Sequence, residues 1–132
     1  MVTLYVLPCD NQDLHNPERA KASFGSIVTS SRILDKPLID DLIITVTTPW
    51  FAYIYSDEHI DGKLREALPV FLAAQYDCLV LMKKKLHTDG EISVYQSPRV
   101  FRRGVQIKPG LLIPKAADNL QFERILDGWI RE

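Results

Sequence analysis

Three uninterrupted apolar runs constrain the fold of this chain more than any other feature. Residues 2–7, 50–55 and 78–82 read VTLYVL, WFAYIY and CLVLM, and none of them alternates between polar and apolar side chains. A strand with one face in water alternates, whereas a strand covered on both faces does not. The runs therefore predict buried strands of the kind found in parallel sheets.

The segments between these runs favour helices. Asn16 followed by Pro17 is typical of a helix start, residues 64–72 carry an apolar helix face interrupted by Pro69, and the last apolar residues, 122–130, also lie at helical spacing. Residues 37–47 fit a helix or a strand, with a helix favoured. Shorter signals predict a strand at 32–34 and, after a turn at 87–90, an alternating strand at 92–95.

This order of elements predicts an α/β fold, a Rossmann-like, mostly parallel sheet flanked by helices, with a small antiparallel ribbon in the C-terminal half. With 132 residues, 46% of them hydrophobic, we expect one domain spanning 1–132. The net charge of −1 argues against nucleic-acid binding. The apolar runs are too short to span a membrane and the N-terminus lacks a signal-peptide pattern, so a cytoplasmic protein is expected.

Polar residues follow two of the predicted strands. The first strand runs into Pro8, Asp10 and Asn11, and the central segment TPWFAYIYSDEH ends in Asp57, Glu58 and His59. Ligands of α/β sheets gather at the carboxyl ends of the strands. Asp57, Glu58 and His59 are candidate ligands for Mg²⁺ or Mn²⁺. The alternative is that these residues only begin the next helix.

Three segments in this order resemble the inverting, nucleotide-sugar glycosyltransferases of the GT-A fold. TLYVLPCDN resembles their opening strand, TPWFAYIYSDEH resembles the segment that delivers the metal-binding carboxylates, and SPRVFRRG resembles a proline and arginine stretch of bacterial members. The resemblance implies a nucleotide-diphospho-sugar donor, a divalent cation, Mn²⁺ or Mg²⁺, and transfer of the sugar to a sugar, lipid or protein acceptor.

The resemblance also implies roles for individual residues. Asp57 and Glu58 would bind the cation and serve catalysis, with His59 as a further metal ligand. The nucleotide-sugar would be held by residues from three parts of the chain: Pro8, Asp10, Asn11, Asp35, Arg99, Arg102 and Arg103.

Two features depart from the family pattern or leave it open. Tyr55 stands where the family has the first metal-binding aspartate. The catalytic base that inversion requires is not singled out, and Asp89, Glu91, Asp118 and Glu123 are all candidates by their order. The run Lys83-Lys84-Lys85 is interpreted as a solvated strand end, although phosphate binding is an alternative.

The sequence thus predicts a short glycosyltransferase-like enzyme. The alternatives are a catalytically inactive binding or assembly module and, less favoured, a small metal-dependent hydrolase using Asp57, Glu58 and His59. A homo-oligomer is a further hypothesis, because so short a chain has little room to enclose an acceptor site.

Overall fold

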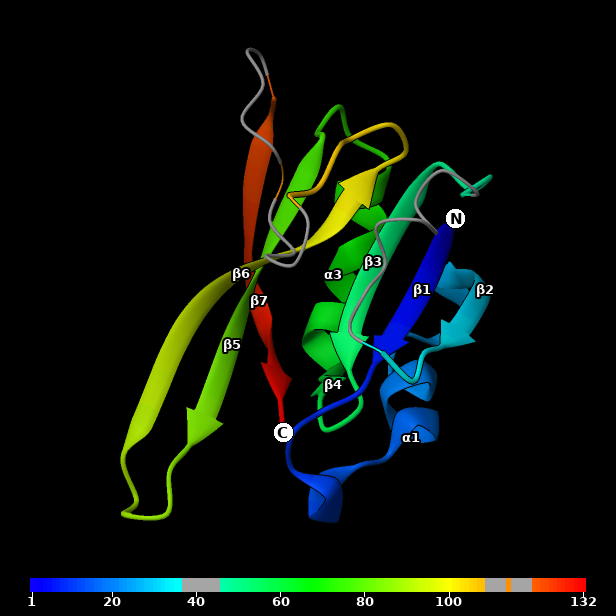
Figure 1. Cartoon of the computed structure of the whole chain (residues 1–132). Helices are drawn as coiled ribbons and strands as arrows, with labels where there is room; N and C mark the ends of the chain where they lie inside the picture. The colour runs from blue at the N-terminus through cyan, green and yellow to red at the C-terminus, as the bar shows by residue number, and fades with distance from the viewer. Residues whose placement is uncertain (37–45, 109–113, 115–119) are drawn as a thin grey trace.

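The computed structural model describes residues 1–36, 46–108, 114 and 120–132. Its regular elements, shown in Figure 1, are β1 (Val2–Leu7), α1 (Pro17–Ala22), β2 (Val28–Ile33), β3 (Trp50–Tyr55), β4 (His59–Ile60), α3 (Gly62–Leu72), β5 (Cys78–Leu86), β6 (Ile92–Arg102) and β7 (Phe122–Arg131), with short 3-10 helices at Gln12–Leu14 and Gly25–Ile27.

The strands form one mixed sheet in the order β2-β1-β3-β6-β5-β7-β4. β1 runs parallel to both β2 and β3, whereas β6 is antiparallel to both of its neighbours, β3 and β5. β7 runs parallel to β5 and antiparallel to β4. Leu7 lies opposite Tyr55 in the register, so the carboxyl ends of β1 and β3 lie side by side at the same end of the sheet.

Both faces of the central strands are buried, as the uninterrupted apolar runs predicted. Even-numbered side chains of β1 and β3, such as Leu4 and Ile54, pack with α1 and α3. Odd-numbered ones, such as Tyr5 and Phe51, form a second core, in which the rings of Phe51 and Phe101 stack at 5.3 Å. In the described part of the chain this second core is completed by loop residues and not by helices.

The predicted Rossmann-like sheet with helices on its faces is wrong. The sheet is mixed and curled. Of the described residues, 46% are in strands and 20% in helices, and two of those helices are α-helices. The two helices lie on one side of the sheet (Figure 1). The second core consists of aromatic and aliphatic side chains of the sheet that are covered, in the described part of the chain, by loop residues such as Val105 and Ile107.

The largest error concerns the C-terminal segment, which was expected to be helical and is the strand β7. Ile125, Gly128 and Ile130 are its buried residues, while Leu126 is 71% exposed. The pairing with β5 shifts register between Leu81 and Lys83, and Gly128 has φ +96°. This irregularity moves the buried side from odd to even residues, so the apolar spacing imitates a helix.

Other predictions agree with the structure in part. Asn16 caps α1, as predicted, by accepting a hydrogen bond from the backbone N–H of Arg19 at 3.1 Å. The cap of α3 is Asp61, through Leu64 N at 3.0 Å, so the alternative that Asp57, Glu58 and His59 begin that helix is wrong. The helix expected around 64–72 is α3, but Pro69 does not interrupt it, because the helix continues to Leu72. The antiparallel ribbon is present but longer than expected, and most of the predicted helix at 37–47 lies outside the described residues.

None of the helices in the described part of the chain is long and apolar enough to cross a membrane.

Candidate ligand crevice

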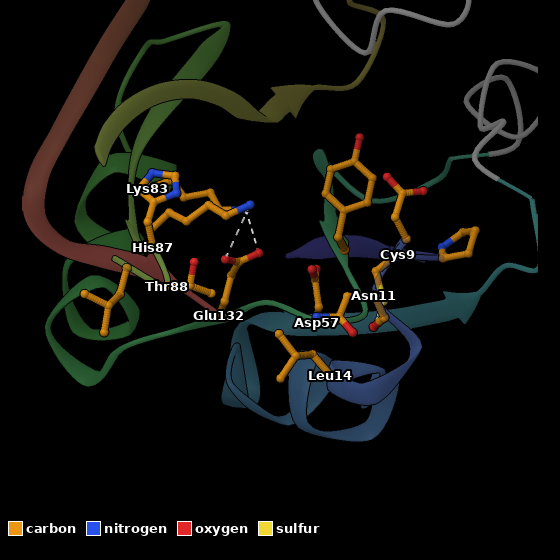
Figure 2. A pocket seen from close by; sticks show the side chains of 13 residues that line it. Cys9, Asn11, Leu14, Asp57, Lys83, His87, Thr88 and Glu132 are labelled. Carbon is orange, nitrogen blue, oxygen red and sulfur yellow. Dashed lines mark hydrogen bonds and ion pairs between the residues drawn. The ribbon is translucent and has the colours of Figure 1, made fainter. Parts of the chain in front are cut away.

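A crevice of about 810 Å³ opens where β1 and β3 end. Figure 2 shows side chains from three parts of the chain converging on it. The residues that line it are Pro8, Cys9, Asp10, Asn11, Leu14, Tyr55, Asp57, Lys83, Lys85, Leu86, His87, Thr88 and Glu132. The carboxyl ends of β1 and β3, where polar residues were expected to gather, therefore border a cavity of the size that small ligands occupy.

One wall is the loop after β1. The Asn11 side chain accepts a hydrogen bond from Asp13 N at 3.1 Å, and Cys9 Sγ donates to Asn11 O at 3.2 Å. The Gln12 side chain donates to Cys9 O at 3.0 Å. These bonds connect neighbouring residues of the loop, and Pro8, Asp10 and Asn11 line the crevice; that they bind a nucleotide-sugar stays a prediction.

The opposite wall is formed by β5 and the end of β7. Successive residues of a strand point to opposite faces, so Lys83 and Lys85 face the crevice, whereas Lys84 lies 5.5 Å from the centre of the Trp129 ring. The ammonium groups of Lys83 and Lys85 each lie 3.8 Å from a carboxylate oxygen of Glu132. This wall therefore carries two cations and one anion.

Between the walls, β3 ends in a tight turn that separates two consecutive carboxylates. Glu58 N donates to Tyr55 O at 3.0 Å, and the Glu58 carboxylate folds back to accept from Tyr55 N at 2.9 Å. Asp57 lies on the outer side of this turn and lines the crevice (Figure 2). Neighbouring residues of one motif are thus directed to different environments.

Glu58 lies beneath the crevice and is fully buried. Its carboxylate accepts from both terminal nitrogens of Arg99, at 2.7 and 2.9 Å, and from Lys83 Nζ at 2.5 Å. Burial raises the pKa of Glu58, but the charge and hydrogen bonds of Arg99, and then of Lys83, outweigh burial and lower the pKa to about 2. The carboxylate is therefore ionised and engaged by partners of its own chain.

Arg99, the partner of Glu58, is also buried and makes several contacts. Its guanidinium lies over the rings of Tyr53 and Tyr55, 4.8 and 5.4 Å from their centres, and its Nε donates to Ser97 Oγ at 2.7 Å. The side chain is 4% exposed. The structure thus places Arg99, which was predicted to contact a phosphate, in the sheet core below the crevice.

Asp57 has the opposite electrostatic environment. Burial, followed by the negative charges of Glu58 and Glu132, raises the pKa of Asp57, and Lys83 lowers it only in part. Among the residues that line the crevice, Asp57 and Glu132 are thus two carboxylates placed to share a proton or a ligand's positive group.

His59 is directed away from both carboxylates, because it begins the short strand β4, which pairs with β7. Its Nδ1 is buried without a hydrogen-bond partner in the described part of the chain, and burial, followed by the charges of Arg19 and Arg131, lowers its pKa. Within the described ranges, 1–36, 46–108, 114 and 120–132, no three acidic, histidine or cysteine side chains form a group suited to a metal ion. The structure does not bring Asp57, Glu58 and His59 together.

Two of the predicted phosphate-binding arginines lie at the other end of the sheet. β6 is antiparallel to β3, so the chain moves away from the crevice between Arg99 and Arg102. Arg102 donates to the carbonyl oxygens of Tyr76 and Ala74, each at 2.8 Å, and lies over the Trp50 ring. Arg103 donates to the Thr47 carbonyl at 2.8 Å.

The remaining predicted residues of the described chain do not line the crevice. Asp35 is exposed and follows β2. Asp89 and Glu91 are exposed in the turn between β5 and β6, where Asp89 Oδ1 accepts from Glu91 N at 3.0 Å. Of the other two candidate bases, Glu123 is in β7 and Asp118 lies outside the described residues.

Sequence reasoning undervalued Lys83 and Lys85 and missed His87 and Glu132 as crevice residues. Alternation along β5 could have placed both lysines on one face, had the strand been extended to Leu86. Glu132 could not have been found, because its position depends on β7 being a strand.

No protein-family model matches the chain, and no curated protein is significantly similar to it.

Proposed function

We propose that the crevice binds a nucleotide-diphospho-sugar and that the protein transfers the sugar to an acceptor. The observation that carries the proposal is the arrangement of charge: Lys83 and Lys85 face a cavity of about 810 Å³ whose far wall is the Pro8–Asn11 loop. Nucleotide-sized ligands fit cavities of this size, and a diphosphate is attracted to paired ammonium groups.

Lys85 is the better candidate for phosphate binding. Lys83 already donates to the buried Glu58 at 2.5 Å and its side chain is 17% exposed. The side chain of Lys85 is 43% exposed, and the ion pair that it makes is the longer one with Glu132, at 3.8 Å. A phosphate group can therefore replace Glu132 as the partner of Lys85 with little loss of free energy.

Asp57 is the carboxylate that we assign to catalysis. Inverting transfer needs a base that accepts the proton of the acceptor hydroxyl, and a raised pKa suits a carboxylate to this role. Glu58 does not suit it, because its pKa is lowered to about 2. The resemblance of TLYVLPCDN and TPWFAYIYSDEH to nucleotide-sugar glycosyltransferases supports the reaction class.

The residues expected to hold a divalent cation do not fit one as a set. Glu58 is engaged by Arg99 and Lys83, and His59 does not line the crevice. The proposal therefore assigns the neutralisation of the diphosphate to lysine. The same observation removes the support for a metal-dependent hydrolase built on these three side chains.

Isothermal titration with uridine- and guanosine-diphosphate sugars, with and without Mn²⁺, tests the binding step. Lys85→Ala should weaken binding about 10-fold, the effect of losing one charge-assisted hydrogen bond. Lys84→Ala is the matched control, because Lys84 points to the other face and should leave the affinity unchanged. Absence of binding by the unaltered protein, or equal losses in both variants, would contradict the proposal.

A second measurement separates an enzyme from a binding module. Asp57→Asn should retain binding and its melting temperature but lose sugar transfer, followed as release of the nucleoside diphosphate with candidate acceptors. Binding without turnover in the unaltered protein, across sugar, lipid and peptide acceptors, would favour the inactive module.

A further inference from the structure

The outer part of the β5–β6 hairpin projects beyond the rest of the sheet (Figure 1). β6 pairs with β3 only from Val100 to Arg102, whereas it pairs with β5 along its length from Ile92. Residues 92–96 therefore have a strand on one side and, within the described residues, none on the other. Their outward backbone groups form an open strand edge.

This open edge lacks the features that usually protect one. Residues 92–96 read ISVYQ and contain no charged residue and no proline. The side chains of Ile92, Val94 and Tyr95 are 55%, 52% and 46% exposed. Natural proteins commonly place lysine, proline or a bulge at such edges, because an unprotected edge pairs readily with another strand.

The exposed apolar side chains also lie in a row. Leu86 is opposite Ile92 and Lys84 is opposite Val94, so Leu86, Ile92 and Val94 share one face of the hairpin. Leu86 is 69% exposed. Lys83 and Lys85 point to the other face, toward the crevice, and lie on β5, one strand away from the open edge.

We propose that the open edge of β6 pairs with the same edge of a second copy of this chain. Antiparallel pairing about a two-fold axis would join the two hairpins in the order β5-β6-β6-β5. Such an interface is self-complementary, since each strand meets its own sequence in reverse. The neutral edge favours this partner, because self-pairing of a charged edge would set like charges opposite each other.

The pairing also accounts for the exposure of Ile92 and Val94, whereas Leu86 lies on β5 and lines the crevice. Ile92 and Val94 of the two copies lie on the same face of the four-stranded arrangement, so they cover each other while the backbone groups pair. The crevices remain outside the interface. The inference is thus independent of the proposed ligand.

Sedimentation velocity over a micromolar concentration series tests the pairing. The unaltered protein should approach twice the 15.1 kDa chain mass, and Val94→Lys should sediment as a monomer at all concentrations. Val70→Lys is the matched control, because Val70 is 72% exposed on α3 and the same change there should leave the dimer intact. A monomeric unaltered protein, or a dimeric Val94→Lys variant, would overturn the proposal.

Hydrogen exchange locates the interface without a substitution. Those amides of residues 92–96 that point to the open edge should exchange more slowly at high protein concentration than at low concentration, whereas the turn at 88–90 should not change. A dimer whose 92–96 amides exchange at one rate throughout would show that the copies meet elsewhere and would overturn the assignment.

Discussion

The crevice and the layer beneath it contain similar charged groups but use them differently. Below the crevice, Glu58 accepts four hydrogen bonds, from Arg99, Lys83 and the Tyr55 backbone, and its pKa falls to about 2. In the crevice, burial, followed by the charges of Glu58 and Glu132, raises the pKa of Asp57. The comparison shows that the donors around a carboxylate, and not its place in a motif, decide whether it supports the fold or faces a ligand.

Replacing Glu58 or Asp57 with its uncharged amide should have opposite effects on the free energy of unfolding. The effect at Glu58 is the largest that we expect. Glu58→Gln leaves the buried Arg99 without a full counter-charge and should lower the free energy of unfolding by about 3–5 kcal/mol. Asp57→Asn should change it by less than about 0.5 kcal/mol, or increase it, because a repulsion is removed. Urea denaturation at neutral pH measures both. Equal losses of unfolding free energy in the two variants would show that Glu58 and Asp57 do not differ in their contribution to stability.

The two carboxylates should also affect the pH dependence of stability in opposite directions. The pKa of Glu58 is lower in the folded state than its ordinary value of 4.5, so its contribution is complete above pH 4.5 and is lost as the pH falls toward about 2. A shift of this size corresponds to about 3 kcal/mol. Asp57 acts in the opposite direction, because its raised pKa favours the folded state once it is protonated.

Urea denaturation across this range measures the acid dependence. Glu58→Gln should remove most of the acid-induced loss between pH 4.5 and pH 2, and Asp57→Asn should make that loss steeper. If the unaltered protein and Glu58→Gln lost stability in parallel, Glu58 would not be the group responsible.

The path of β7, which brings Glu132 to the crevice, depends on one glycine. Gly128 has φ +96°, and a Cβ there would lie 2.3 Å from Leu64 N and 2.5 Å from Asp61 Oδ1, at the start of α3. Gly128→Ala should therefore cost about 2–3 kcal/mol. Gly90→Ala is the control, since Gly90 has φ +87° with no atom near its Cβ position and should cost about 1 kcal/mol.

Thermal or urea denaturation compares the two glycine variants. A cost at Gly128 no larger than at Gly90 would mean that β7 can move away from α3, and that the position of Glu132 is not fixed by this contact.

The smallest effect is expected at the far end of the sheet. Arg103→Ala removes a hydrogen bond to the Thr47 carbonyl but lies away from the crevice, so nucleotide-sugar affinity should not change. Titration alongside Lys85→Ala measures this. A comparable loss of affinity in Arg103→Ala would place the ligand at the opposite end of the sheet from the crevice.

Local signals predicted several elements and the position of the crevice. The runs at 2–7 and 50–55 are buried strands, Asn16 caps a helix, and Pro8, Asn11 and Asp57 lie at one edge of the sheet. The separation of Asp57 from Glu58 was not predictable. It depends on Arg99, which comes 41 residues later in the chain and reaches Glu58 only because β6 pairs with β3.

Local hydrophobic patterns and capping signals were enough to predict which segments are buried and where strands give way to polar residues. The fold class and the lining of the crevice follow instead from contacts between segments that are far apart in the chain. β7 is a strand because β5 offers it a partner, and its shifted register hides the alternation that would have revealed it. Side chains from β5 and β7 reach the crevice because these strands pair with partners that are distant in the sequence. The spacing of residues along the chain does not reveal such contacts.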